Sequence, residues 1–486
     1  MSVSLPQLHW GGLMPFLLLT ATALGVMVLD LFLSAERRLS LAYLGCAGLL
    51  MTMFLLITDF GGPERAVGEM LLLDDLSRFL HLTFLLIALL TLLVSVNYLE
   101  REGISHGGEY YVLILFGTLG MMVMASAMDL IMIFLGLEAL SIPLFILSGF
   151  LKSRPGSNES ALKYLLLGAL ASAFLLYGIA FLYGATGSTR VGRIAAHLSR
   201  GEAWENPLVF LGVGLLLTGL AFKVAAVPFH MWVPDVYEGA PTPVTAFMIT
   251  GTKGAALAAL LRAFGVALAP IRLEWVAPLW VLAVLTMGVG NVAALTQRSI
   301  KRMLAYSSIA HAGYLLVALV AGTSRGFSGI LFYLVAYAFM NLGAFAVIIA
   351  LAQQGEDRPD LDAYAGLGFR HPLLAFSMAV FMFSLAGLPP TGGFMGKFYI
   401  FTAAVEADFI GLAVIAVLCS LISVFFYLKV VVVMYMEQPR EDSPTPILKP
   451  AIAIVLILSA LATLQLGILP GGVWELAVRS VRSFWG

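Results

Sequence analysis

The sequence predicts an all-α, polytopic membrane protein with about 14 transmembrane helices. Of its 486 residues, 60% are hydrophobic and only 11% are charged, whereas about 25% of the residues in a soluble domain are charged. Apolar runs of the roughly 20 residues that a transmembrane helix needs follow one another along the chain. The loops between these runs are too short to build a core of their own, so membrane spans account for the whole chain.

The spans are expected where the apolar runs lie. In chain order these are residues 10–34, 40–58, 79–98, 110–128, 129–150, 161–184, 207–233, 241–262, 275–296, 302–322, 327–353, 371–404, 408–436 and 449–469. The first run lacks the flanking positive charges and the cleavage site of a signal peptide, so we expect it to stay as a helix. The segment VWELAVRSVRSFW, which begins at residue 473, has the pattern of an amphipathic helix at the membrane surface.

Basic residues in the loops predict the orientation of the helices, because short cytoplasmic loops are enriched in Lys and Arg. One set of alternate loops carries more of these residues than the other, and QRSIKR at 297–302 is the clearest cytoplasmic segment. This bias places both termini on the outer side of the membrane.

Composition also excludes several classes of function. The net charge is −1 and no basic stretch resembles a nucleic-acid-binding element. Cys46 and Cys419 both fall in apolar runs and no CxxC occurs, so we expect no iron–sulfur cluster or structural zinc on this chain alone. Neither a GxxxxGK[ST] motif nor a strand followed by GxGxxG is present, so we expect no nucleotide site. The energy that the protein uses must come from an ion gradient or from a partner.

Six basic residues fall inside the expected spans, where a charge costs at least roughly 2.5–3.5 kcal/mol. Lys163, Arg262 and Lys429 lie near helix ends. We expect these three side chains to extend along the lipid to the interface with their charged ends in water.

The other three, with one glutamate, do not fit that explanation. Glu138 and Lys253 lie near the middle of their spans, too far from either interface. Lys223 is followed by Pro228, and Lys397 comes just after LPPTGG at 388–393, so both lysines adjoin expected helix breaks. A broken helix at membrane depth needs protein or water to satisfy its backbone. These breaks therefore predict hydrated cavities beside the two lysines.

His311 also lies in the middle of a span, and the polar residues Tyr306, Ser307 and Ser308 precede it by about one turn. A lone buried histidine is more often a core residue with satisfied hydrogen bonds. A histidine that titrates near neutral pH could instead pass a proton along. A haem would need paired histidines at one depth, and only His81 and His311 fall within spans beyond the first residue and before the last turn, so we do not expect haem.

Together these residues suggest a proton path. We expect Glu138 and Lys223 to form an ion pair, since an opposite charge favours the charged lysine whereas removal from water favours the neutral one. Separating the pair would release the proton of Lys223, and bringing it together would reload it. Lys253, His311 and Lys397 would continue the path.

The expected broken helices are the seventh and the twelfth spans. Two similar units that are related by a shift of five helices have opposite orientations in the membrane, which is an inverted repeat. The expected division is residues 1–109 for transmembrane helices 1–3, 110–262 for the first repeat of helices 4–8, 275–436 for the second repeat of helices 9–13, and 437–486 for helix 14 and the interfacial tail.

Three segments carry a resemblance to a known family. They read FKVAAVPFHMWVPDVYEGAPTPVTAF at 222–247, NVAALTQRSIKRMLAYSSIAHAGY at 291–314 and FSLAGLPPTGGFMGKF at 383–398. These segments resemble the antiporter-like subunits of bacterial NADH:quinone oxidoreductase, respiratory complex I, and their relatives in multisubunit cation/proton antiporters. Within that family, PDVYEGAPTPV is similar to the subunit N branch.

The resemblance implies a role for each singled-out residue. Glu138 and Lys223 match the family's essential glutamate and lysine on helices five and seven. Lys253 matches the lysine at the channel centre, and Lys397 the residue of the exit half. His311 lies where the family places polar residues of helix ten. All five would belong to the proton path.

The resemblance also implies the surroundings of the chain. It would sit in the bacterial inner membrane beside a neighbouring antiporter-like subunit and the small membrane subunits near the quinone site. In such a membrane, the bias of the loops places its termini in the periplasm. NADH, FMN, iron–sulfur clusters and quinone would be bound by other subunits, with no cofactor in this chain. No nucleic acid is expected as a partner.

Two alternatives stay open from the sequence. A subunit of a multisubunit sodium/proton antiporter would share the lysines and the breaks. Only the sequence of residues 235–247, which is similar to the subunit N branch, argues against it. A passive scaffold would use buried charges to hold helices together. The number of costly charges in mid-span makes the scaffold the weaker alternative.

Overall fold

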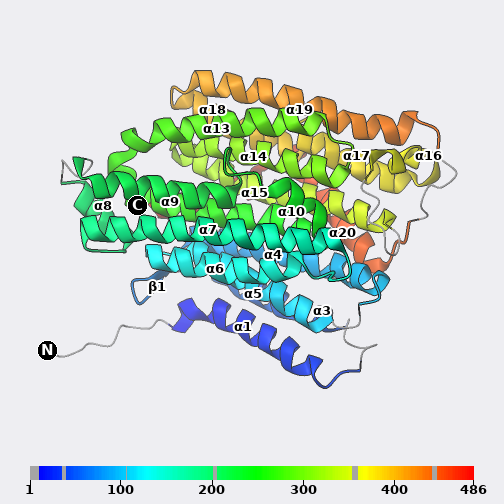
Figure 1. Ribbon diagram of the computed structural model, residues 1–486, viewed down its shortest axis with the longest axis horizontal. Helices are drawn as coiled ribbons and strands as arrows, with labels where there is room; N and C mark the ends of the chain where they lie inside the picture. Colours follow the sequence, from blue (N-terminus) through cyan, green and yellow to red (C-terminus); the bar gives the residue numbers. More distant parts are fainter. Residues whose placement is uncertain are drawn as a thin grey trace.

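The computed structural model describes residues 10–34, 40–104, 107–200, 205–352, 360–439 and 446–485. Its long helices run side by side in a single bundle (Figure 1). In these residues, thirteen helical segments are long and apolar enough to cross a membrane. A fourteenth crossing is made of two half-helices, α17 (Pro372–Ala386) and α18 (Gly392–Glu406). The expected all-α membrane fold with about 14 spans is therefore confirmed.

Most crossings are single helices. In the first half of the chain they are α1 (Trp10–Asp30), α3 (Leu41–Thr58), α4 (Asp75–Arg101), α5 (Gly107–Ser126), α6 (Leu130–Ser148), α7 (Pro155–Thr186) and α9 (Pro207–Val224). In the second half they are α13 (Arg272–Leu295), α14 (Ile300–Ala321), α15 (Ser324–Leu351), α19 (Ile410–Met436) and α20 (Pro450–Ile468).

The eighth crossing is composite and lies at the centre of the bundle. It consists of α11 (Thr242–Phe247), the π-helix η2 (Met248–Thr252), α12 (Lys253–Arg262) and a second π-helix, η3 (Ala263–Ala267). The apolar window of this crossing is entirely buried, unlike that of any other crossing described. It therefore faces protein on all sides.

Short elements join the long helices. They are the antiparallel hairpin β1 (Arg65–Val67) and β2 (Leu71–Leu73), α8 (Val191–Leu198), α10 (Val233–Gly239), η4 (Ala269–Ile271), η5 (Leu361–Tyr364) and α16 (Leu367–Arg370). The last element is the C-terminal helix α21 (Gly471–Trp485). The basic loop residues Arg37, Arg38, Arg358 and Arg440 lie outside the described residues.

Polar residues set several helix starts. The carboxylate of Asp74 accepts a hydrogen bond from the backbone N–H of Ser77, whose hydroxyl accepts one from the backbone N–H of Asp74. This capping box satisfies donors that a helix start leaves free. It explains why α4 begins at Asp75 and not at the expected residue 79. At the starts of α6 and α9, the side chains of Asp129 and Asn206 each accept a hydrogen bond from one backbone N–H, that of Ile131 and that of Leu208.

Glycines let pairs of helices approach closely. A side chain at Gly120 of α5 would meet the backbone of α6 at Leu140, and one at Gly136 of α6 would meet α5 at Met124. Gly290 of α13 and Gly313 of α14 face each other's helices as closely. Small residues at such crossings let backbones pack tightly where no hydrophobic effect holds helices together in lipid.

Two sets of five crossings have similar internal contacts. In the first set, α5 packs against α6 and α12, and α7 packs against α9. In the second set, α13 packs against α14 and α19, and α15 packs against both halves of the twelfth crossing. This parallel agrees with the expected division into 110–262 and 275–436, which stays a prediction.

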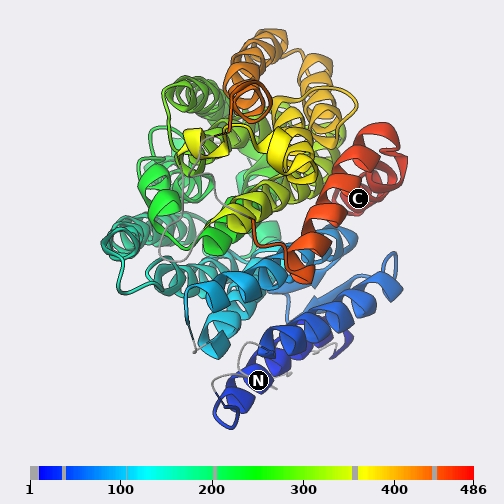
Figure 2. The same cartoon turned by 90° about the vertical axis from the view of Figure 1, so that its right-hand side faces the viewer.

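The C-terminal helix joins distant parts of the bundle. Figure 2 shows the N-terminal helices in dark blue at one edge and the C-terminal helices in red at the flank. Trp474 of α21 stacks on Tyr399 of α18 at 3.8 Å between ring centroids, and Nε of Arg479 lies 3.6 Å from the carboxylate of Asp75. The expected amphipathic helix is present, but its apolar face packs against α15 and α4. Amphipathic pattern alone does not say what covers an apolar face.

Arg262 does not reach a lipid interface, so the expectation for it was wrong. Its side chain is 2% exposed and donates to the carboxylate of Asp74 at 2.8 Å and to the carbonyl of Ala125 at 3.2 Å. The helix that carries it is enclosed by protein, and the polar start of α4 provides the partner. Lys163 is partly exposed and paired with Glu159 and Asp235, and Lys429 is exposed.

Removing only one charge of the Arg262–Asp74 pair should destabilise the protein strongly. We expect Arg262→Met to cost about 3–5 kcal/mol, because it leaves a buried carboxylate without its counter-charge. The double variant Asp74→Asn with Arg262→Met removes both charges and keeps an acceptor that can cap α4, so it should regain most of the loss. The thermal stability of each variant is measured by heating membranes, extracting them with detergent and blotting the chain that stays soluble. A double variant as unstable as the single one would contradict the explanation.

Candidate functional site

Lys223 lies in the last turn of α9, where the helix ends. Its ammonium donates to the hydroxyl of Ser141 on α6 at 2.7 Å and to the hydroxyl of Tyr164 on α7 at 3.2 Å, and it lies 5.2 Å from the centre of the Tyr164 ring. The hydroxyl of Ser141 in turn donates to the carbonyl of Leu137 at 2.5 Å. The lysine is 3% exposed, so these groups replace its hydration.

The expected Glu138–Lys223 ion pair is not formed. Among the described residues, no contact within salt-bridge distance joins the two side chains, although Glu138 is close enough to act electrostatically on the lysine. The carboxylate oxygen Oε1 of Glu138 is buried without a hydrogen-bond partner. Instead of Glu138, Ser141, about one turn further along α6, accepts the hydrogen bond from the ammonium of Lys223. The structure thus holds the two charges close but separated.

The chain breaks directly after Lys223. Ala225 has a positive φ of 68°, a conformation that is uncommon for a residue other than glycine, and it ends α9. The backbone N–H of Val227 in the break donates to the hydroxyl of Thr286 on α13 at 2.9 Å. The break is therefore held by the second set of helices, as expected for broken helices at membrane depth.

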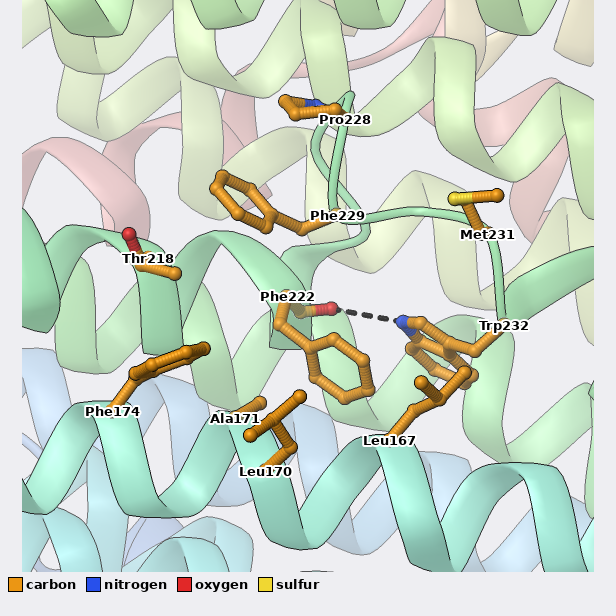
Figure 3. A pocket seen from close by; sticks show the side chains of 10 residues that line it. All are labelled: Leu167, Leu170, Ala171, Phe174, Thr218, Phe222, Pro228, Phe229, Met231 and Trp232. Carbon is orange, nitrogen blue, oxygen red and sulfur yellow. Dashed lines mark hydrogen bonds between the residues drawn. The ribbon is translucent and has the colours of Figure 1, made fainter.

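Aromatic rings pack beside this break. Figure 3 shows Trp232 next to Phe222, with its indole N–H pointing at the carbonyl of Phe222, to which it donates at 3.2 Å. The indole stacks on Tyr164 with 4.6 Å between centroids and 6° between planes. With Leu167, Leu170 and other apolar side chains it lines a cavity of about 190 Å³. The stack fixes the tyrosine that holds Lys223.

Lys253 starts α12, directly after the π-turn of η2. It has no exposed surface, and its ammonium donates to the backbone carbonyl of Ser308 on α14. Departures from α-helical geometry of this kind are frequent at functional sites. The position at mid-span that we expected for Lys253 is therefore also the position of a helix irregularity.

His311 of α14 lies among tyrosines. Its Nε2 is 2.9 Å from the hydroxyl of Tyr427 on α19, and its Nδ1 contacts the hydroxyl of Tyr333 on α15. Tyr314 and Tyr337 place their rings against the imidazole at centroid distances of 5.6 and 5.3 Å. Lys253 and Lys397 are the charged groups that act on it electrostatically.

Sequence reasoning missed these tyrosines. Tyr333 and Tyr337 are four residues apart and share a face of α15, but aromatic residues at that spacing are more often part of a core. Tyr427 is far from His311 in the sequence and has no local signal. Only the packing of α14, α15 and α19 brings the tyrosines together.

Lys397 of α18 spans the second break. Its ammonium donates to the carbonyls of Leu385 and Ala386 at 3.0 Å each and to the hydroxyl of Ser420 at 2.9 Å. The two carbonyls belong to the last turn of α17, which ends at Gly387 with a φ of 84°. An ammonium has three N–H donors, and three acceptors surround it. This geometry fits the charged form of the side chain.

A charged cluster that the sequence did not reveal lies next to the first break. Asp235 of α10 accepts from Lys163 of α7 at 2.6 Å and from Arg302 of α14 at 2.9 Å, and Arg302 also donates to Glu238 at 2.8 Å. Burial alone would raise the pKa of Asp235, but the hydrogen bonds from Lys163 and Arg302 hold it below its ordinary value. The cluster anchors α10 to both sets of helices.

The structure thus gathers the predicted residues into two groups. Glu138 and Lys223 form one, and Lys253, His311 and Lys397 the other. The two groups are connected by the packing of α9 against α12. Each residue can bind or release a proton. Within the described ranges, no set of three His, Cys, Asp or Glu side chains is placed to hold a metal ion.

Comparison with known sequences finds close relatives. Residues 127–423 match the protein family described as NADH:quinone oxidoreductase/Mrp antiporter, TM. The chain is 48% identical to NADH-quinone oxidoreductase subunit N of Trichlorobacter lovleyi over 97% of its own length and 96% of that protein. It is 47% identical to the subunit N of Chloroflexus aggregans over 99% of both chains.

Comparison with solved structures finds the same fold. A chain in the structure of respiratory complex I from Thermus thermophilus with bound aureothin is 38% identical, with a TM-score of 0.82 over 96% of this chain and 99% of that one. A chain of the Mrp complex from Dietzia sp. has a TM-score of 0.83 over 98% of this chain and 97% of that one at 22% identity. The second similarity concerns the fold alone.

The charge of Asp235 should not change near neutral pH. A carboxyl whose pKa is lowered by folding contributes stability above its unfolded value, and this contribution is lost only as the pH falls through the folded value. We therefore expect Asp235→Asn to lower the heat resistance of the chain in membranes by the same amount at pH 6 and pH 8. A difference that grows between these two pH values would show that another group titrates in the cluster.

Proposed function

Because the chain belongs to the family of NADH-quinone oxidoreductase subunit N, we propose that it carries protons across the bacterial inner membrane along the row from Glu138 to Lys397. It does so as a membrane subunit of the proton-pumping oxidoreductase. This row consists of the residues that the sequence predicted, which are Glu138, Lys223, Lys253, His311 and Lys397. We propose a role in proton transfer for each of them.

The observation that carries the proposal is the burial of Lys223, Lys253 and Lys397. They are 3%, 0% and 4% exposed, and no carboxylate contacts any of them among the described residues. Uncharged hydroxyls and carbonyls hold them instead. A scaffold would gain more from apolar side chains or from paired charges, since unpaired buried charges are costly. A role in proton exchange accounts for lysines that are buried without a counter-charge.

The first group supports a two-position cycle for Lys223. In one position the ammonium pairs with Glu138, which favours the protonated lysine. In the other, which the structure holds, Ser141 and Tyr164 supply only neutral acceptors. A neutral environment favours the uncharged amine more than a carboxylate does. Movement of the lysine or of α6 between these positions would load and release one proton.

The second group supports onward transfer. A proton released by Lys223 would reach Lys253, pass His311 and arrive at Lys397, whose three acceptors fit an ammonium. Because Lys397 holds the last carbonyls of α17, its loss of a proton would weaken the bond between the two halves of the broken crossing. Protonation and the position of α18 would thus be linked.

The rest of the complex supplies the energy in this proposal. NADH, FMN, iron–sulfur clusters and quinone are bound by other subunits, and this chain contributes no redox centre. Its two cysteines, Cys46 and Cys419, are on separate helices and buried, which suits packing and not cluster binding. The termini are periplasmic, and a neighbouring antiporter-like subunit and small membrane subunits cover part of the apolar surface.

The relatives favour this proposal over a sodium/proton antiporter subunit. Several proteins between 43% and 48% identical carry the name NADH-quinone oxidoreductase subunit N. The Mrp chain is similar in fold at lower identity. Dependence of ion transport on NADH oxidation separates the two functions by experiment.

Neutralising the first group should stop pumping. We expect Glu138→Gln and Lys223→Met each to reduce NADH-driven proton uptake by inverted vesicles at least about tenfold, because each removes a group that transfers the proton. Quinone reduction should fall with it, since the two processes are coupled. Assembly of the complex is checked on native gels.

Lys429→Met provides the matched control. Lys429 is a lysine of α19 with an exposed side chain, so its loss should leave pumping near the wild-type rate. Near-normal pumping in assembled Glu138→Gln and Lys223→Met complexes would sink the proposal and favour a scaffold. Pumping that persists without NADH oxidation would favour an antiporter.

A further inference from the structure

The tyrosines around His311 have no part in the path as described so far. We propose that Tyr427 and Tyr333 exchange protons with His311, so that the histidine passes a proton by changing from one neutral tautomer to the other. This inference rests on the proposed function and names additional residues that carry out its central step.

Both nitrogens of His311 are engaged by hydroxyls. Nε2 faces Tyr427 and Nδ1 faces Tyr333, and the hydroxyl of Tyr427 also contacts the hydroxyl of Ser307. A neutral imidazole has one donor and one acceptor nitrogen. A hydroxyl can donate or accept, so both tautomers can form the same set of hydrogen bonds. Carbonyl or ammonium partners would allow only one.

The proton balance of the step is closed. At the start, Ser307 donates to Tyr427, Tyr427 donates to the bare Nε2, and Nδ1–H donates to Tyr333. Tyr427 gives its proton to Nε2 and takes the one from the Ser307 side, while Nδ1 gives its proton to the Tyr333 oxygen, whose own proton leaves. One proton enters on one side and one leaves on the other. The hydroxyls then rotate, and the imidazole reorients so that a bare nitrogen faces Tyr427 again, because a proton that returned through the same hydrogen bonds would cancel the transfer.

The two sides of the imidazole lead toward different lysines. Ser307 is next to Ser308, whose carbonyl accepts from Lys253. On the other side, the ring of Tyr333 lies against Gly396, where an added Cβ would come within 2.3 Å of it, and Gly396 is next to Lys397. These contacts and chain neighbours give the proposed order Lys253, Ser307, Tyr427, His311, Tyr333, Lys397.

Electrostatics favours a neutral histidine as the carrier. The charged groups that act on His311 are Lys253 of α12 and Lys397 of α18, and the other polar groups in contact with its ring are uncharged tyrosines. A positive charge on either lysine opposes an imidazolium between them. A tautomer exchange moves the proton without adding a charge to the ring. Such a step needs a hydroxyl on each nitrogen, which the structure provides.

The experiment compares three phenylalanine variants of the assembled complex. Tyr427→Phe and Tyr333→Phe remove one hydroxyl each, and we expect each to slow NADH-driven proton uptake at least about tenfold. Tyr111→Phe is the matched control, because Tyr111 is a buried tyrosine of α5 whose hydroxyl has no hydrogen-bond partner. It should pump at the wild-type rate.

A second measurement tests proton transfer apart from packing. Replacing Tyr427 with a fluorinated tyrosine keeps the ring and makes the phenol more acidic, so we expect the pH profile of pumping to shift. A purely structural hydroxyl would leave the profile in place. Wild-type pumping in assembled Tyr427→Phe and Tyr333→Phe complexes would overturn the inference. If Lys223→Met abolishes pumping in that case, the proposed function survives without the tautomer step, and if it does not, both fall.

Discussion

The hydrogen bonds that protein groups supply to buried ammonium ions constrain the rest of this structure. Lipid offers no acceptors, so each lysine at membrane depth must find oxygen atoms within the bundle. Helix breaks, a π-turn and inward-facing hydroxyls provide them. Close crossings such as that at Gly120 and Gly136 bring the helices near enough for these short contacts to form. The irregular parts of the backbone therefore lie where the charges are.

The same constraint explains what could be predicted from the sequence. A lysine in mid-span and a proline-rich break are both visible along the chain, and they predicted Lys223, Lys253 and Lys397 together with the broken crossings. The fate of Arg262 was not visible, because its partner Asp74 comes from a helix far away in the sequence. Tyr427 was missed for the same reason. Local pattern shows that a charge needs a partner, but the tertiary packing decides which residue that is.

The direct contact that we expected between Glu138 and Lys223 is not formed, and the reason is informative. The sequence contained both charges and a reason to pair them, and it places Ser141 about one turn after Glu138 in the same span. It could not show that the ammonium of Lys223 contacts the hydroxyl of Ser141. Glu138, with its oxygen Oε1 buried without a hydrogen-bond partner, and Lys223, held by neutral groups, form a separated pair. Such a pair can respond to a small movement of α6, whereas a closed pair would have to be broken first.

The two sets of helices solve the same problem with different chemistry. Lys223 has a carboxylate nearby on α6, but α14, which the expected repeat would pair with α6, carries His311. A neutral histidine cannot balance the charge of Lys397, so that lysine depends on the carbonyls of Leu385 and Ala386 at the negative end of a helix dipole. In the first set, a displacement of the Lys223 side chain relative to Glu138 can change the charge state of that lysine. In the second set, the change has to involve the end of α17, which couples proton release there to the position of a helix.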